Sequence, residues 1–457
     1  MKTAKSKYQK HSGVALIISM VFVLIFSALA MAMFSISGTN VQIADNHHKA
    51  NLAFATAESG LDVLRYWLSR IKMPSSTPVS AYFNTIITDL RTDLTTHDIW
   101  HLQPDYDGTI PAVSLDSAAT QTFSTHLQMD PANPAVLQVY VTGAYGGITC
   151  TIRVDYNIAP YKYPIFNFGL ATKGPLHFPG NPTLIGANAL WEADVYVESL
   201  NDPTAVFVGG NTNFDGDIAI SNPVGAADFT GDVIIAGEHG EPAIANHVLA
   251  GVDPVEFPVP DTDRFKVYAT GDVIDLSTDT TKGMTITNGI IPAATNPTFG
   301  GTVTIQGILF IEQPNVVTFA RNVSLQGMIV ADGSLEAPGT NAINILGNFA
   351  TAPYPPGAQF DAIRHEIGSS IVAPGFSATF AGNYSTIEGI MALSGVHFMG
   401  NASAVIKGSI INYSDTPAVV EGNTSMTFDR LSSTKVPAGF DTHRVLEYDP
   451  SSYSVVH

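Results

Sequence analysis

Three alternating oxygen-bearing side chains are the best candidates for a metal site in this sequence. Asn213, Asp215 and Asp217 occupy every second position of NTNFDGDIA, a spacing that could present amide and carboxylate oxygens to Ca²⁺. The Glu that closes an EF-hand loop is missing, and a polar turn explains the same residues. The 13 histidines are scattered, without an HExxH motif or a paired spacing. We therefore expect no cofactor, and these three residues remain a weak candidate for a metal.

Two pairs of carboxylates are the candidates for acid–base chemistry. Asp194 with Glu198, and Glu366 with Glu388, could approach each other within or between structural repeats. Paired carboxylates cleave glycosidic bonds in polysaccharide-active enzymes. However, the region lacks the basic cluster that a lyase for acidic sugars would use, and the sequence has no Gly-x-Ser-x-Gly, P-loop or dinucleotide-binding motif. We expect a protein that is not an enzyme, with a membrane-anchored β-helix enzyme acting on polysaccharide as the alternative.

The composition limits the function classes further. The chain has 457 residues, of which only 13% are charged, and it contains 39 Gly and 28 Pro. Low charge with many Gly and Pro favours a mainly β chain with tight turns. The net charge of −19 excludes a general nucleic-acid binder, because phosphate binding requires clustered Lys and Arg. A single cysteine, Cys150, excludes a disulfide scaffold.

The N-terminal region predicts one long helix with a membrane-spanning half. Residues 1–13 hold four lysines and no acid, and residues 14–44 carry no charge. The apolar core at 14–34 is long enough to cross a hydrocarbon layer of about 30 Å. The preceding lysines predict a cytoplasmic amino end and an exported remainder. Apolar residues then recur at helical spacing without a Pro until Pro74, so we expect a helix over 14–72.

Three interpretations of this segment remain open from the residues alone. A cleaved secretory signal is one, with ALAMA at 28–32 as the cleavage region, although the apolar core is longer than usual. An uncleaved signal anchor is the second. The third follows from a family resemblance.

The N-terminal region resembles the type IV pilin-like proteins, specifically the PilX amino-terminal family of pilus assembly proteins. The resemblance is carried by the basic leader ending in Gly13, by GVALIISMVFVLIFSALAMAMF, and by NLAFATAESGLDVLRYWL at 51–68. It implies that a prepilin peptidase cleaves after Gly13 and that Val14 becomes a methylated amino terminus. It further implies that the apolar helices pack together in a filament, with other pilins and the pilus assembly machinery as partners.

One residue departs from the pattern of major pilins. They usually carry Glu at the fifth mature position, which is Ile18 in this chain. The loss of this charge suits a minor component of the filament. Further along the helix, Glu58 is expected to contact the head or a neighbouring subunit, with a solvated surface acid as the equal alternative.

Residues 73–160 predict a small pilin-like head with a β-hairpin. A short helix is expected near 80–94, and apolar residues alternate on both sides of the glycines at 143–147. Cys150 is expected on the buried face of this hairpin.

Residues 161–457 predict a parallel β-helix, also called a β-solenoid. The form apolar-x-Phe-x-x-Asn recurs at 176–181, 317–322, 378–383 and 396–401, which predicts stacked Phe and Asn side chains. Pro242–Asp263 interrupts the pattern and is expected to be a loop or cap-like insertion, and the tail after Asp415 a terminal cap. A series of glycines recurs with steps of 18 to 21 residues at 271, 289, 307, 327, 347, 368, 389 and 408.

The sequence thus predicts an α+β, mainly β protein with four segments. They are a leader (1–13), a long N-terminal helix (14–72), a pilin-like head (73–160) and a β-solenoid with a terminal cap (161–457). The expected function is that of a structural minor pilin or pseudopilin. It would be anchored in a bacterial inner membrane, then displayed on a surface pilus, where the solenoid meets a surface, a glycan or another pilin. A static envelope scaffold is the remaining alternative.

Overall fold

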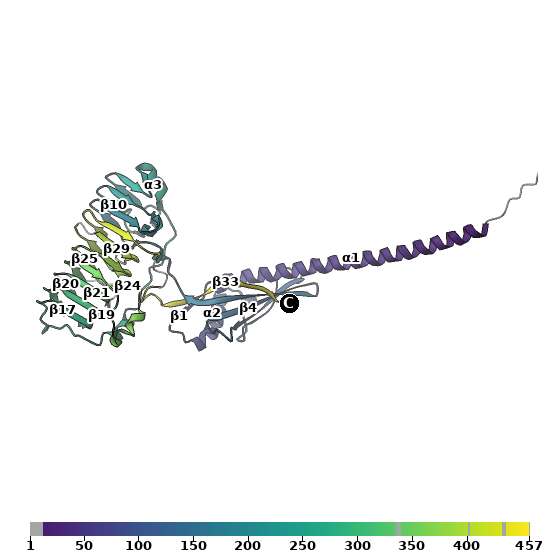
Figure 1. Cartoon of the computed structure of the whole chain (residues 1–457), viewed down its shortest axis with the longest axis horizontal. Coiled ribbons are helices and arrows are strands. Elements are labelled where there is room, and N and C mark those ends of the chain that lie inside the picture. The colour runs from purple at the N-terminus through teal and green to yellow at the C-terminus, as the bar shows by residue number, and fades with distance from the viewer. Residues whose placement is uncertain (1–11, 334, 336–339, 401–402, 432–435, 457) are drawn as a thin grey trace, which may run out of the picture. The chain divides into compact units, whose positions relative to one another are not determined.

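The computed structural model describes residues 12–456, apart from 334, 336–339, 401–402 and 432–435. The chain forms two compact units (Figure 1). The head unit runs up to Ala159 and resumes at Arg444, and the solenoid unit takes Pro160–His443. The solenoid is therefore an insertion within the head, which the sequence analysis did not anticipate.

The head combines two helices with one six-stranded sheet. Helix α1 (Ser12–Leu68) has 57 residues, and α2 (Tyr82–Thr96) corresponds to the short helix expected near 80–94. The predicted hairpin is β4–β5, in which Val139 pairs with Val154 and the turn glycines 146 and 147 have φ of +57° and +83°. The sheet order is β1 (Lys72–Pro74), β33 (His443–Val456), β5 (Ile148–Pro160), β4 (Val136–Tyr145), β3 (Gln121–Met129) and β2 (Thr109–Ser114).

Strand β33 corrects the prediction for the C-terminal tail. The tail is predicted to form a solenoid cap, but its last strand, β33, lies between β1 and β5 in the head sheet. Tyr161 N donates to His443 O, and Asp155 N donates to Ser452 Oγ, so β33 runs antiparallel to β5. The pairing partner lies about 290 residues away, and no local turn signal marks it.

The solenoid unit is a stack of short, mostly parallel strands in three sheets, as the repeats predicted. The first sheet consists of β13 (Ala226–Phe229), β10 (Thr204–Val208), β7 (Leu176–Phe178), β31 (Ala418–Val420), β28 (Val396–Phe398), β25 (Ser377–Phe380), β22 (Ala342–Ile345), β20 (Val316–Phe319) and β18 (Thr298–Phe299). The second consists of β15 (Glu238–His239), β14 (Val233–Ile235), β11 (Thr212–Phe214), β8 (Thr183–Gly186), β32 (Ser425–Phe428), β29 (Ser403–Lys407) and β26 (Thr386–Glu388). The third consists of β16 (Val248–Ala250), β12 (Ile218–Ile220), β9 (Val195–Val197), β6 (Leu170–Thr172), β30 (Ile410–Asn412), β27 (Ile390–Leu393), β24 (Ser369–Ala373), β21 (Val323–Ala331), β19 (Val303–Ile311) and β17 (Met284–Ile291), with β23 (Phe349–Thr351) beside β21.

The coils are not stacked in sequence order. The chain enters the stack in its middle, at β6, β7 and β8, and winds outward to β16 and helix α3 (Glu241–His247) at one end. Residues 251–283 then lead to β17 at the opposite end, and the later coils wind back until β30, β31 and β32 pair with β6, β7 and β8. The solenoid therefore consists of two blocks of coils that meet at a seam.

A buried carboxylate fixes this seam. Glu192, in the 3₁₀ turn η4 (Leu190–Ala193), is 0% exposed. Its Oε1 accepts hydrogen bonds from the backbone N–H of Arg430 (2.7 Å) and Leu431 (3.0 Å), and its Oε2 accepts from those of Asn188 (2.6 Å) and Ala189 (3.1 Å). The Arg430 guanidinium donates in turn to the carbonyls of Glu192 and Trp191. One side chain thus joins the first block to the last coil.

The repeated Phe and Asn residues occupy the positions that the sequence predicted. Phe380 and Phe398 stack at 4.9 Å between ring centroids, in a core that is buried throughout. At the following corner, Asn side-chain oxygens accept from a backbone N–H one coil away, as Asn181 does from Asn211 at 2.9 Å and Asn322 from Asn348 at 3.2 Å. Asn181 also donates its amide to the Asn423 side chain at 2.8 Å, so the predicted contact between amides is present there. The fourth repeat residue, Asn401, lies outside the described residues.

The glycine series is confirmed in part. Gly307 pairs with Gly327, and Gly408 lies against Gly389, so these glycines form a column along the stack. Gly347 does not belong to it. This glycine lies beside Arg321 at the Asn corner, so the equal spacing combined two different columns.

The eleven-stranded sheet is covered on its outer face as well. A second apolar cluster there combines strand residues such as Phe310 with residues from segments outside the coils, among them Phe265, Phe360 and Phe440. Burial on both faces explains why these strands read as continuous apolar runs without alternation. The remaining short helices are η1 (Val79–Ala81), η2 (Trp100–Leu102), η3 (Pro164–Asn167), η5 (Asp263–Tyr268), η6 (Ala358–Phe360) and η7 (Ile363–His365).

Candidate functional site

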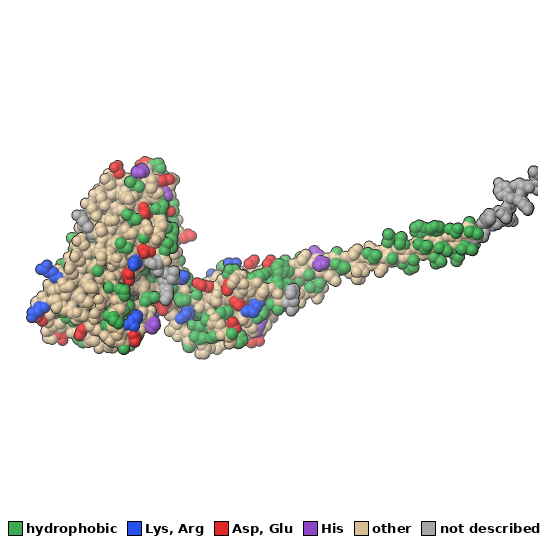
Figure 2. Space-filling view, in the orientation of Figure 1, with side chains coloured by type: hydrophobic (Ala, Val, Ile, Leu, Met, Phe, Trp, Pro, Cys, Tyr) green, Lys and Arg blue, Asp and Glu red, His purple; other side chains and the backbone are tan. Residues whose placement is uncertain are grey.

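Helix α1 divides into an exposed apolar half and a half that packs on the head sheet. The stretch from Val14 is long and apolar enough to cross a membrane, and its most apolar window has a mean hydropathy of 2.8 and is 0% buried. Figure 2 shows hydrophobic side chains around this half of the helix. Such a surface is unfavourable in water, so this half of the helix requires lipid or other apolar helices around it.

The predicted processing residues lie in the first turns of α1. The helix begins at Ser12, so the Gly13–Val14 bond lies within its first turn. The Val14 and Ile18 side chains are 58% and 50% exposed. The leader residues 1–11 lie outside the described part of the chain. The first charge after Val14 is Asp45, whose carboxylate pairs with Lys49 at 2.6 Å. The exposed half of the helix therefore presents only uncharged side chains.

The second half of α1 contacts the head sheet through small residues. Ala53 and Ala57 are fully buried, and a Cβ on Gly143 of β4 would lie 2.2 Å from Ala53 O. A Cβ on Gly60 would likewise lie 2.6 Å from the Phe123 ring. Helix and strand thus approach at backbone distance, which explains the small residues of ANLAFATAESG.

Glu58 makes a helix-to-head contact, one of the two roles considered for it. Its carboxylate accepts a hydrogen bond from the Tyr453 hydroxyl of β33 at 3.1 Å. Burial, followed by the nearby Glu58 carboxylate, raises the pKa of Tyr453 to about 12. The Arg65 guanidinium lies 4.7 Å from the centroid of the Tyr448 ring on the same strand. The C-terminal strand is therefore bound to the helix by side chains that no local motif identifies.

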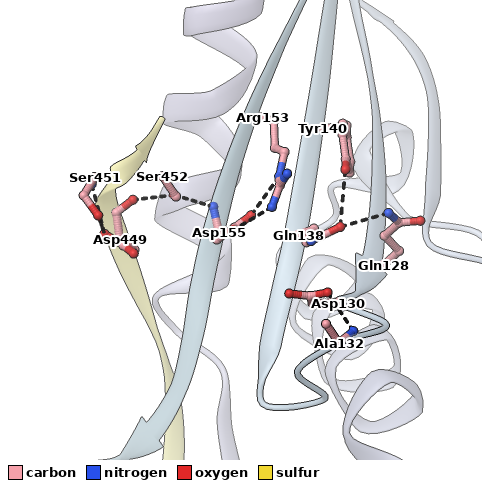
Figure 3. A network of polar contacts seen from close by, with 10 residues as sticks. All are labelled: Gln128, Asp130, Ala132, Gln138, Tyr140, Arg153, Asp155, Asp449, Ser451 and Ser452. Carbon is pink, nitrogen blue, oxygen red and sulfur yellow. Dashed lines mark hydrogen bonds and ion pairs between the residues drawn. The ribbon is translucent and has the colours of Figure 1, made fainter. Parts of the chain in front are cut away.

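The same strand is held to its neighbour by polar contacts (Figure 3). The Asp155 backbone N–H donates to Ser452 Oγ at 2.7 Å, and the Asp155 carboxylate forms an ion pair with Arg153 at 2.9 Å. Asp449 accepts hydrogen bonds from the backbone N–H and the hydroxyl of Ser451 within β33. Cys150, predicted on the buried face of the hairpin, is half-buried on β5, and burial raises the pKa of its thiol.

The candidate calcium ligands do not converge. Asn213 is exposed on β11, while the Asp215 carboxylate accepts from Gly186 N at 3.1 Å. The Asp217 carboxylate contacts His247 Nδ1 at 2.7 Å, and its backbone N–H donates to Asp194. Within the described residues, no group of three or more His, Cys, Asp or Glu side chains could hold a metal ion. The two aspartates instead make hydrogen bonds within the coils.

Of the two carboxylate pairs considered for catalysis, only Glu366 and Glu388 line the same cleft. Burial raises the pKa of Asp194 to about 6, but its contact is with Asp217 and not Glu198. Glu366 and Glu388 line one cleft, as expected for residues on neighbouring coils. Each of them is in an ion pair: Glu366 with Arg264 at 2.5 Å, and Glu388 with Lys407 at 3.0 Å.

Solved structures similar to this chain include the following two. The first is the competence-associated pilin ComZ from Thermus thermophilus, with a TM-score of 0.22 and 11% identity over 90% of this chain and 98% of that one. The second is a glycosylated ice-binding protein (LeIBP) from an Arctic yeast, with a TM-score of 0.20 and 13% identity over 61% of this chain and 97% of that one. No protein-family model and no curated protein sequence matches the chain. At these scores, the argument for function rests on the residues of the chain itself.

Proposed function

We propose that this protein is a minor pilin-like subunit of the PilX amino-terminal type, which displays a β-solenoid at the surface of a bacterial cell. The observation that carries the proposal is the division of α1. From Val14 onward its first half is an exposed apolar helix, and its second half is packed against the head sheet. An anchor that is part of a head helix suits a subunit that moves from a membrane into a bundle of similar helices.

The proposed route begins in the inner membrane, with the amino end in the cytoplasm and the head and solenoid exported. Apolar burial retains α1 in the bilayer, at roughly 25 cal/mol for each Å² removed from water. Cleavage by a prepilin peptidase after Gly13 leaves Val14 as a methylated amino terminus. The assembly machinery then transfers the helix to a filament.

Ile18 supports a minor position in that filament. A carboxylate at this place would have to pair with a neighbour's terminal amine, because an unpaired charge among apolar helices is costly. This chain has Ile18 at that position and cannot form the pair. At the tip of a filament no subunit lies above it, so the missing pair costs no stability there. The proposal therefore favours the tip over the shaft.

For the solenoid we propose a role in adhesion or interaction without catalysis. Both carboxylates in its cleft are engaged in ion pairs with a neighbouring cation. A glycosidase needs its two carboxyl groups free to flank the scissile glycosidic bond. The engagement of both carboxylates therefore supports binding over hydrolysis.

The processing proposal is tested by intact mass and amino-terminal sequencing of the native protein, from cell membranes and from sheared surface material. We expect a chain that starts at methylated Val14 and occurs in the sheared fraction. A Gly13→Leu variant should keep Met1 and stay in the membrane. The matched control is Gly38→Ala, because a Cβ at Gly38 meets no atom within 4 Å and the residue lies beyond the cleavage site.

Two results would overturn this proposal. A chain that keeps Met1 and is found only in membranes would leave an anchored scaffold or enzyme. A chain that starts near Met33 would indicate ordinary secretion of the head and solenoid.

A further inference from the structure

A cleft is present in the solenoid where one coil is interrupted. Strand β23 ends at Thr351, and the chain re-enters the coil at Ser369, the start of β24. Between them, η6 and η7 contribute Phe360 and Ile363 to the apolar cluster over the eleven-stranded sheet. The cleft beside this excursion has a volume of about 580 Å³, which lies in the usual range of small-molecule sites.

The charged residues of the cleft are balanced. Arg364 and Lys407 line it together with Glu366 and Glu388, although the whole chain carries a net charge of −19. All four are in ion pairs, since Arg364 contacts Asp361 at 2.5 Å and the other three are paired as described above. The cleft therefore presents hydrogen-bond donors and acceptors side by side without a net charge.

The Glu388–Lys407 pair is the accessible part of this set. The two residues are directly opposite each other on β26 and β29, and their side chains remain 46% and 39% exposed. A ligand hydroxyl could donate to the carboxylate and accept from the ammonium group at the same time. A ligand with a full charge would instead compete with one member of the pair.

Part of the cleft lining has no side chains. It includes Gly327, Gly368 and Gly389, and a Cβ on Gly389 would lie 2.8 Å from the Gly368 carbonyl carbon. Pro353 and Ile367 add apolar surface to the lining. A lining of glycines, apolar side chains and paired polar groups complements a molecule that has apolar faces and a rim of hydroxyl groups.

We propose that this cleft binds a short, uncharged saccharide. The sugar hydroxyls bond to Glu388 and Lys407, and a ring face lies against the glycines and apolar side chains of the lining. This inference deepens the adhesive role proposed for the solenoid and rests on it for its biological use. The test measures saccharide binding by purified protein. A negative result would not affect the processing test, and a negative processing test would not affect the binding result.

The test uses the full chain in lauryldimethylamine oxide, because a detergent with a sugar headgroup would compete for the site. Cellotriose, maltotriose and triacetylchitotriose serve as uncharged probes, and trigalacturonic acid as a charged one, in saturation-transfer NMR followed by calorimetric titration. The variants are Lys407→Gln, Glu388→Gln, and Ala352→Trp, which places a large side chain in the cleft. The matched control is Lys282→Gln, because Lys282 is in an exposed ion pair with Asp279 and is not part of the lining.

We expect at least one uncharged trisaccharide to bind, with the dissociation constant raised about tenfold or more by each cleft variant. The control should bind as the native chain does, and all variants should keep the native circular dichroism and melting temperature. The proposal is overturned if no uncharged probe binds, or if binding persists in Ala352→Trp. It is also overturned if trigalacturonic acid binds more tightly than the uncharged probes, which would assign the cleft to anions.

Discussion

The seam between the two blocks of coils should depend on the Glu192 carboxylate, and Glu192→Gln tests this with a minimal change of shape. The carboxylate accepts four backbone N–H groups, two at each oxygen. An amide has one oxygen, so two of the four buried N–H groups would face an NH₂ donor. Each buried donor without an acceptor costs about 1 to 3 kcal/mol. We therefore expect a loss of about 4 kcal/mol from the free energy of unfolding of the solenoid.

Urea unfolding of the full chain in detergent measures this loss by circular dichroism. Trp191 provides a local fluorescence signal, because the Arg430 guanidinium lies 4.9 Å from the centroid of its ring. The control is Glu421→Gln, whose carboxylate contacts His397 at the surface and should cost less than about 1 kcal/mol. A Glu192→Gln protein that unfolds within 1 kcal/mol of the native chain would refute the reasoning.

The same residue predicts a pH dependence. Its four backbone hydrogen bonds outweigh the effect of burial and lower the pKa of Glu192 to about 2, from 4.5. A lowered folded-state pKa means that the stabilisation is complete above about pH 4.5 and is lost as the pH falls towards 2. The difference in unfolding free energy between the native chain and Glu192→Gln should therefore narrow over this range. A difference that stays constant down to pH 2 would contradict the assignment.

Three further predictions follow from described contacts. Gly143→Val should destabilise the head by about 3 kcal/mol or more, because its Cβ would lie 2.2 Å from Ala53 O; an unchanged rate of proteolysis of the head would contradict it. Phe380→Ala should cost the solenoid about 3 to 5 kcal/mol in urea unfolding, because it removes a ring from a buried stack, and a loss below 1 kcal/mol would show a core that readily collapses. Asp194→Asn should gain stability relative to the native chain as the pH rises through 6, because burial raises the pKa of this acid and the folded state then disfavours its charge; equal pH profiles of the two proteins would rule this out.

Local patterns in the sequence were sufficient to predict the helices and strands, but not the order in which the coils stack. Apolar spacing predicted α1 and the β4–β5 hairpin, and the Phe and Asn repeats predicted the parallel coils. The winding order was not predictable, because every coil has a similar pattern and the seam depends on Glu192, a single acid without a motif. The position of β33 was missed for a related reason. Its alternation is weak, and Pro450 interrupts the strand pattern.

In the candidate site, too, repeat spacing predicted some features, whereas others depend on long-range contacts. Glu366 and Glu388 come together because a step of about one coil separates them, which repeat spacing can predict. Asn213, Asp215 and Asp217 were a weak metal candidate from alternation alone, yet Asp215 and Asp217 bond to different partners, because the strand ends at Phe214. The excursion that forms the cleft could not be predicted, since its helical turns are held by long-range apolar contacts such as those of Phe360.

The return of the chain to the head has a consequence for the timing of folding. A head strand at the C-terminus cannot form until all 284 residues from Pro160 to His443 have been synthesised. At about 5 to 20 residues per second, this delay is on the order of 15 to 60 seconds. During this time the head has neither the β33 pairing nor the Tyr453 contact to Glu58. The head sheet can therefore be completed only in a chain that already contains the whole solenoid. A chain that ended within any coil would lack β33 and would leave the edge of β5 unpaired.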